Sequence, residues 1–182
     1  MSLGASPDSE ELHLDPVRAD ADIAALSASL APAFGGVSEP AREILEQTLS
    51  LLTRDPRPDP WGSYLASASG QTIGICAFKA APDSDGVVEI AYMTFPAFEG
   101  RGHAGAMAAA LVEVAAAAGA PLVIAHTLPQ ENASNRALRR NGFVHAGEVI
   151  DPEDGLVWRW EKAIVPPRRR MGMGPTRWVG EG

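Results

Sequence analysis

FEGRGHAGAM, residues 98–107, joins a strand-like segment to a helix-like segment through three glycines. Gly100, Gly102 and Gly105 have the spacing G-x-G-x-x-G, in which glycine allows a positive φ and a close approach of the backbone to a ligand. The N–H groups in the first turn of a helix lack partners within the helix, and the helix dipole adds to their attraction for anions. The stretch therefore predicts a phosphate-binding turn, with a tight turn that packs small residues as the alternative.

The surrounding sequence argues against a dinucleotide-binding fold. That fingerprint belongs to a first strand–helix–strand unit, with an acidic residue about 20 positions further on at the end of the second strand. Here the next strand-like segment, LVIAHT at 122–127, ends in His126 and Thr127, and more than half of the chain precedes the glycines. No lysine follows the glycines directly, which excludes a P-loop.

Hydrophobic periodicity and turn residues predict one mixed α/β domain over residues 10–163. We expect strands at 11–17, 63–68, 72–80, 87–95, 121–128, 144–150 and 156–163, and helices at 20–34, 38–52, 103–118 and 133–143. Residues 1–9 are expected to form a disordered tail, and 164–182 a flexible tail. Packing of Trp178 on a partner subunit is the alternative for the second tail.

Composition limits the classes of partner. With 46% hydrophobic residues, 21% charged residues and no long apolar run, the sequence is typical of a globular protein outside the membrane. The net charge of −8 disfavours nucleic acid and favours a basic substrate. Cys76 is the only cysteine, and the first residues lack a secretory signal, so we expect a cytoplasmic protein. The four histidines and one cysteine have no metal-ligand spacing, so no metal is expected.

Two segments carry a resemblance to a known family: VVEIAYMTFPAFEGRGHAGAMAAALV at 87–112 and VIAHTLPQENASNRALRRNGFVHAGEV at 123–149. They are similar to GNAT acyltransferases, in particular to the RimJ/RimL branch of ribosomal-protein N-acetyltransferases. The resemblance implies a central, mostly antiparallel sheet with helices on both faces. It also implies acetyl transfer from acetyl-CoA, by direct attack, to a primary amine of a protein N-terminus or a small molecule. A non-catalytic acyl-CoA-binding sensor of the same fold is the alternative, and a homodimer is a possible assembly.

The resemblance also assigns the residues that hold coenzyme A. The family's pyrophosphate loop has the pattern Q/R-x-x-G-x-G/A, which residues 99–104 match except for Glu99 at the first position. In the family a splayed strand pairs with the pantetheine arm, and here that strand corresponds to EIAYMTF, residues 89–95. The implied cofactor-binding residues are Met93, Thr94, Arg101, Gly102, His103, Ala104 and Gly105, with contacts from Asn132 or Asn135.

Acetyl transfer to an amine requires removal of a proton from the nucleophile and protonation of the leaving thiolate. Glu89 matches the general base of histone-acetylating relatives, as base or as water-positioning residue; a structural hydrogen-bonding role is the alternative. The tyrosine that serves many family members as acid is replaced by Leu138. Ser134 matches a serine of the RimL-like branch and is the candidate donor to the sulfur, with a role as helix N-cap as the alternative.

Three further residues are candidates for the substrate pocket. Tyr92 is placed to contact pantetheine or the acceptor, although an aromatic residue in a central strand is often part of the core. His126, at a strand end, is a candidate to line the amine pocket or to be a satisfied polar group. Asp151 belongs to an acidic loop with Glu153 and Asp154 that is suited to hold a cationic amine, or is simply a solvated turn.

Overall fold

The computed structural model describes residues 12–152 and 154–164. The elements in chain order are β1 (His13–Pro16), α1 (Ile23–Leu30), the 3₁₀ turn η1 (Ala31–Phe34), α2 (Glu39–Arg54), β2 (Ser63–Ala68), β3 (Gln71–Phe78), β4 (Val87–Thr94), the 3₁₀ turn η2 (Pro96–Phe98), α3 (His103–Ala117), β5 (Leu122–Thr127), α4 (Ala133–Arg140), β6 (Val144–Asp151) and β7 (Gly155–Ala163). Each helix and strand lies where the sequence pattern predicts one, whereas the 3₁₀ turn η2 was not predicted. The tail expected at 1–9, Glu153 and the Trp178 segment lie outside the described residues.

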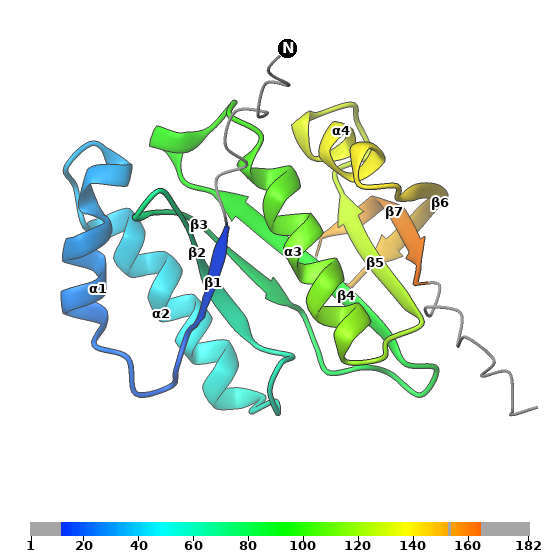
Figure 1. Cartoon of the computed structure of the whole chain (residues 1–182), viewed down its shortest axis with the longest axis horizontal. Coiled ribbons are helices and arrows are strands. Elements are labelled where there is room, and N and C mark those ends of the chain that lie inside the picture. The colour runs from blue at the N-terminus through cyan, green and yellow to red at the C-terminus, as the bar shows by residue number, and fades with distance from the viewer. Residues whose placement is uncertain (1–11, 153, 165–182) are drawn as a thin grey trace, which may run out of the picture.

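The strands form one seven-stranded sheet in the order β1-β2-β3-β4-β5-β7-β6 (Figure 1). Only β4 and β5 are parallel, and the other neighbouring pairs are antiparallel. The parallel pair is joined by α3, as such a connection requires a crossover. The expected mostly antiparallel α/β sheet is confirmed.

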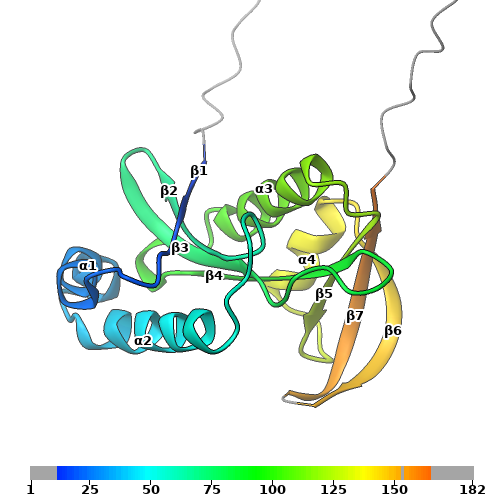
Figure 2. The ribbon, with the colours of Figure 1, turned by 90° about the horizontal axis from the view of Figure 1, so that it is seen from below.

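Helices cover both faces of the sheet: α1 and α2 lie on one face and α3 and α4 on the other (Figure 2). In α2, Ala41, Leu45 and Leu49 are buried at intervals of four, which gives the helix one apolar face. In α3, Met107, Leu111 and Ala115 are fully buried with the same spacing. No helix in the described ranges is long and apolar enough to cross a bilayer.

Cys76 lies in the middle of β3 and is part of the hydrophobic core, as its sequence context predicts. Its side chain is only 2% exposed. Burial raises the pKa of its thiol to about 12, because the thiolate would be poorly solvated there.

The two parallel strands separate along their length. Val87, Val88 and Glu89 of β4 pair with residues 122–124 of β5, but the remainder of β4 pairs only with β3. The remainder of β5 pairs only with β7. The sheet therefore has an opening between the C-terminal halves of β4 and β5.

The position of β4 depends on a close approach at Gly74 in β3. An ideal Cβ on Gly74 would lie 2.4 Å from the carbonyl oxygen of Met93 and 3.0 Å from the sulfur of Met107. The first atom belongs to the backbone of β4 and cannot move without moving the strand. Gly74 therefore lets the end of β4 and the first turns of α3 pack tightly on β3.

We expect Gly74→Ala to lower the free energy of unfolding by about 1–3 kcal/mol, because the added methyl group overpacks this contact. Gly62→Ala is the matched control, since a Cβ there meets nothing within 4 Å and Gly62 has no positive φ. Urea denaturation of the two variants checks this; equal stabilities would contradict it.

Candidate active site

The glycine turn before α3 has the backbone geometry that the sequence predicts. Gly100 and Gly102 adopt φ values of 75° and 86°, which side-chain-bearing residues rarely adopt. Gly102 is the N-cap of α3, no side chain caps the helix, and its first turn contains no acidic residue. The N–H groups of that turn are therefore left for another partner, and an anion is the partner that the helix dipole favours.

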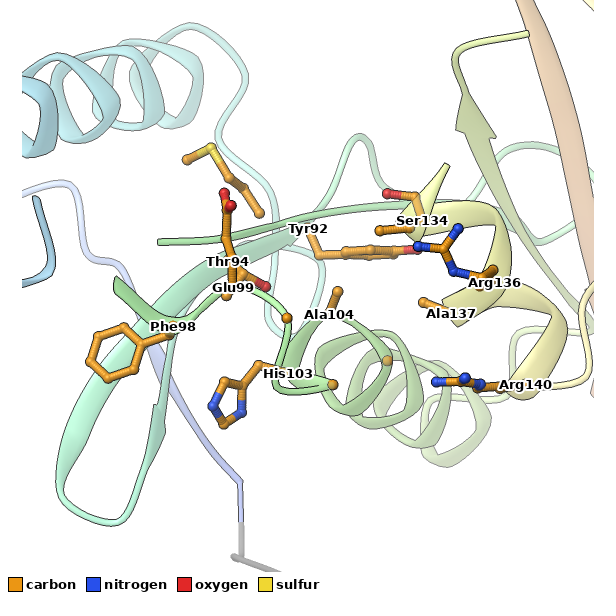
Figure 3. A pocket seen from close by; sticks show the side chains of 15 residues that line it. Tyr92, Thr94, Phe98, Glu99, His103, Ala104, Ser134, Arg136, Ala137 and Arg140 are labelled. Atoms are coloured by element: carbon orange, nitrogen blue, oxygen red, sulfur yellow. The ribbon is translucent and has the colours of Figure 1, made fainter. Parts of the chain in front are cut away.

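A cavity of about 550 Å³ opens beside this turn, and we call it the glycine-loop cavity. Its walls come from the end of β4, the glycine turn, the first turn of α3 and one side of α4 (Figure 3). Of the residues that the resemblance assigns to the cofactor, it is lined by Met93, Thr94, Gly102, His103, Ala104 and Gly105.

Two arginines of α4 also line the glycine-loop cavity, and sequence analysis did not assign them a role. Arg136 and Arg140 lie four residues apart, so they share one helix face, which is turned toward the glycine turn (Figure 3). Asn141 holds the two helices together by donating from Nδ2 to the Gly105 carbonyl at 3.0 Å. The cavity therefore combines helix N–H groups with two cationic side chains and one carboxylate, that of Glu99.

Two buried hydroxyls of β4 are left without hydrogen-bond partners among the described residues: Tyr92 Oη and Thr94 Oγ1. Buried polar groups are nearly always paired, so two orphans in one cavity wall indicate a ligand. Burial raises the pKa of Tyr92 to about 12, and the nearby Ser134 side chain only partly opposes this. Tyr92 is therefore protonated at neutral pH and can donate a proton.

Three of the implied cofactor residues do not line the cavity. Arg101 is exposed, and its guanidinium lies 5.7 Å from the centre of the Phe98 ring. Asn132 accepts a hydrogen bond from the Asn135 N–H at 3.0 Å, and the Asn135 side chain is buried and donates to the Gln130 carbonyl at 2.8 Å. Both asparagines thus fix the start of α4.

The interpretation of Ser134 as the N-cap of α4 is wrong, because Asn132 occupies that position and makes the capping hydrogen bond. Ser134 lies within the first turn of the helix instead, and its side chain lines the glycine-loop cavity. The sequence NASN offers three residues with good capping propensity, which is why propensity alone could not distinguish them.

A second cavity, of about 690 Å³, surrounds Glu89, and we call it the Glu89 cavity. Glu89 Oε1 lies 3.0 Å from Lys79 Nζ and 3.1 Å from His126 Nδ1. Asp151 Oδ2 lies 3.9 Å from the same lysine nitrogen and 3.8 Å from the same histidine nitrogen. Asp154 also lines this cavity.

No group of acidic, histidine or cysteine residues in the described ranges is arranged to hold a metal ion.

Lys79 was missed by sequence analysis because it belongs to no motif. It follows β3 directly, and its N–H donates to the Glu89 carbonyl at 2.8 Å, so strand pairing places the two side chains together. Only the register of β3 against β4 could have revealed the pair.

The two cavities share Tyr92 and Ser134 in their walls. Tyr92 lies in the half of β4 that no longer pairs with β5, and Ser134 lies in the first turn of the helix that follows β5. The glycine-loop cavity, which suits an anionic group, and the Glu89 cavity, which is lined by carboxylates, therefore meet at the opening in the sheet.

The chain belongs to the acetyltransferase (GNAT) domain family, whose sequence model matches residues 11–144. No curated protein sequence matches at a significant level. The family makes the protein an N-acetyltransferase with acetyl-CoA as its co-substrate.

Solved structures with the same fold include acetyltransferases of two kinds. A RimL ribosomal L7/L12 alpha-N-protein acetyltransferase in complex with coenzyme A is 19% identical, with a TM-score of 0.63 over 86% of this chain and 96% of that chain. An acetyltransferase from Salmonella typhimurium that modifies the N-terminal serine of L7/L12 is 17% identical, with a TM-score of 0.60 over 87% and 97%. The aminoglycoside acetyltransferase AAC(6')-Ib in complex with ribostamycin and coenzyme A is 19% identical, with a TM-score of 0.65 over 85% and 94%.

The glycine-loop cavity fits acetyl-CoA on the chemistry of its walls. A diphosphate suits the free N–H groups of α3 and the cations of Arg136 and Arg140. The unpartnered hydroxyls of Tyr92 and Thr94 suit the polar groups of a pantetheine arm along β4.

We expect Arg136→Gln and Arg140→Gln each to weaken coenzyme A binding by about 5- to 10-fold, the equivalent of about 1–1.4 kcal/mol, because each removes a cation from the phosphate side of the cavity. Isothermal titration calorimetry at two salt concentrations checks this, and the loss should be smaller at high salt.

Arg139→Gln is the control on the same helix. Arg139 pairs with Glu131 at 2.6 and 2.8 Å and does not line the cavity. A similar loss of affinity in this variant would show that α4 contributes only its overall charge.

Proposed function

We propose that the chain acetylates a cationic primary amine that enters through the Glu89 cavity and meets the thioester of acetyl-CoA beside Tyr92 and Ser134. The observation that carries this proposal is the shared wall of the two cavities. A ligand in either cavity reaches that wall without crossing the sheet, because β4 and β5 have separated there.

The charges around the Glu89 cavity favour a cation. Three carboxylates line it, those of Glu89, Asp151 and Asp154, against the cations Lys79 and Arg57. Arg57 is already engaged, because its Nε donates to Asp55 and its Nη1 to the Phe78 carbonyl. The net charge of −8 adds a long-range attraction for a basic molecule.

When bound, acetyl-CoA supplies a thioester whose acetyl group is the one transferred. Ser134 and Tyr92 present hydroxyl groups at the junction, and we assign to them the protonation of the leaving sulfur. Tyr92 remains protonated for this role at any pH well below its pKa of about 12. Glu89 belongs to the opposite side of the junction, where the amine must lose its proton.

The similar structures indicate two forms of acceptor: an α-amine of a protein for RimL and an aminoglycoside amine for AAC(6')-Ib. In both acceptors, the ammonium group is attached to a larger polar molecule. An amine panel tests the proposal, with a serine-initiated peptide, the same peptide with glutamate at its second position, spermidine and kanamycin, and free-thiol release as the readout.

We expect thiol release with at least one cationic member of the panel, and a lower kcat/KM for the glutamate-containing peptide than for its parent. Asp154→Asn should raise KM for the preferred amine several-fold with little change in kcat, because Asp154 is an exposed carboxylate that lines the cavity and has no assigned role in the proton transfers. Asp85→Asn, in the loop before β4, is the charge-matched control. Binding of acetyl-CoA with no turnover of any amine would instead support the non-catalytic sensor.

Ser134→Ala separates a chemical role from a structural one. Because Asn132 makes the capping bond of α4, we expect this variant to change the free energy of unfolding by less than about 0.5 kcal/mol while kcat falls about 100-fold. Asn132→Ala is the converse control and should lose about 1 kcal/mol of stability with its cap. An unchanged kcat for Ser134→Ala, measured beside chemical denaturation, would remove Ser134 from the mechanism.

A further inference from the structure

We propose that Nε2 of His126 is the proton acceptor for the acceptor amine, and that Glu89 is the positioning residue that holds the imidazole in place. This assignment rests on the proposed function, because it requires the amine to enter the Glu89 cavity. It changes the role that the family resemblance suggests for Glu89, from base to partner of the base.

Glu89 already has two nitrogen atoms within hydrogen-bond distance. A single carboxylate oxygen, Oε1, lies within 3.1 Å of both Lys79 Nζ and His126 Nδ1. Two donors therefore already occupy one of the two oxygens that would have to take the amine proton if Glu89 were the base. Lys79 does not replace it as a base: burial lowers its pKa, but the hydrogen bond to Glu89 and the charges of Glu89 and Asp151 outweigh burial and raise the pKa overall.

The contact with Glu89 determines which nitrogen of the His126 ring carries the proton. A neutral histidine has one N–H donor and one lone-pair acceptor, and a carboxylate beside Nδ1 fixes the proton on Nδ1. The lone pair is then on Nε2, which is buried and has no hydrogen-bond partner among the described residues. The side chain lines the Glu89 cavity together with Tyr92 and Ser134. A carboxylate that orients a histidine while the other ring nitrogen moves the proton is the arrangement used by catalytic dyads and triads.

The charged and titratable groups around His126 come from several elements. On β7, Arg159 occupies the register position opposite His126, and its Nε donates to Glu161 at 2.8 Å. Among the described residues, the charged and titratable groups that line the same cavity or lie beside His126 on β7 are Arg57, Lys79, Glu89, Tyr92, Asp151, Asp154, Arg159 and its partner Glu161.

The proton and electron balance is simple. The acceptor enters as an ammonium ion and gives one proton to Nε2 of His126, which exposes the nitrogen lone pair. The nitrogen then forms the N–C bond to the acetyl carbon, the C–S bond breaks, and the second amine proton reaches the sulfur through the hydroxyls of Ser134 and Tyr92. His126 returns its proton to solvent after the amide has left, so the net products are the amide, the free thiol and one proton.

His126→Asn is the decisive variant. The asparagine amide can replace the Nδ1–H donor to Glu89, but nothing in it replaces the lone pair of Nε2. With the preferred amine of the panel, we expect kcat to fall about 10²- to 10⁴-fold and the ascending limb of the pH profile to disappear, with unchanged affinity for coenzyme A. His145→Asn is the matched control, because His145 packs against Trp158 and Trp160 and does not line the cavity.

Glu89→Gln distinguishes the positioning residue from the base. This variant should retain the ascending limb, because the lone pair on Nε2 of His126 is still present to accept the proton. The opposite result would overturn the proposal: His126→Asn would keep the wild-type kcat and the ascending limb of the pH profile, and Glu89→Gln would lose both. Glu89 would then be the base.

A measurement without substrate provides an independent test. Long-range proton–nitrogen NMR spectra report which ring nitrogen carries the proton, and the His126 signals are assigned by their loss in His126→Asn. We expect the neutral Nδ1–H form; an Nε2–H form would overturn the proposal even if the enzyme acetylates amines. A wild-type protein that acetylates no amine of the panel would overturn the proposed function and this assignment with it, whatever the tautomer.

Discussion

The separation of β4 from β5 after Glu89 is the constraint on which the rest of the site depends. A strand in the middle of a sheet normally satisfies its N–H and C=O groups on both sides, and the C-terminal half of β4 has a strand partner only in β3. That half-strand therefore has backbone groups to offer a ligand. The close contact of Gly74 with the Met93 carbonyl holds it in place on the side where it is paired. The C-terminal half of β4 is thus held by β3 along one edge and is open along the other.

Opposite charges are placed at the two ends of this opening. On the α3 and α4 side lie helix N–H groups, Arg136 and Arg140; on the other side lie Glu89, Asp151 and Asp154. The first end suits the phosphates of acetyl-CoA and the second suits the cationic amine of the proposed function, while the wall between them contains Tyr92 and Ser134. With such an acceptor, the charges would direct the two reactants to different ends before any specific contact is made.

The helices and strands were predictable because their signals are local, whereas the arrangement of the strands in the sheet was implied only by the family resemblance. Glycines 100 and 102 mark the positive-φ turn, and the apolar spacing of α2 and α3 marks their buried faces. The site was only partly predictable, because it is assembled from pairs distant in sequence. Lys79 meets Glu89 through strand register, and His126 meets the same oxygen from β5. Neither neighbourhood has a local pattern, and the choice of Asn132 over Ser134 as cap depends on backbone geometry that similar residues do not specify.

The burial of Cys76 has a consequence for how the enzyme tolerates oxidation. Every turnover of such an enzyme releases a free thiol next to the protein, and a reactive cysteine nearby would be at risk of forming a mixed disulfide with it. With a pKa of about 12, only about one molecule in 10⁵ carries the Cys76 thiolate at pH 7, and the side chain has almost no contact with solvent. Since Cys76 is the only cysteine in the chain, oxidants that inactivate thiol-dependent enzymes have little to attack here.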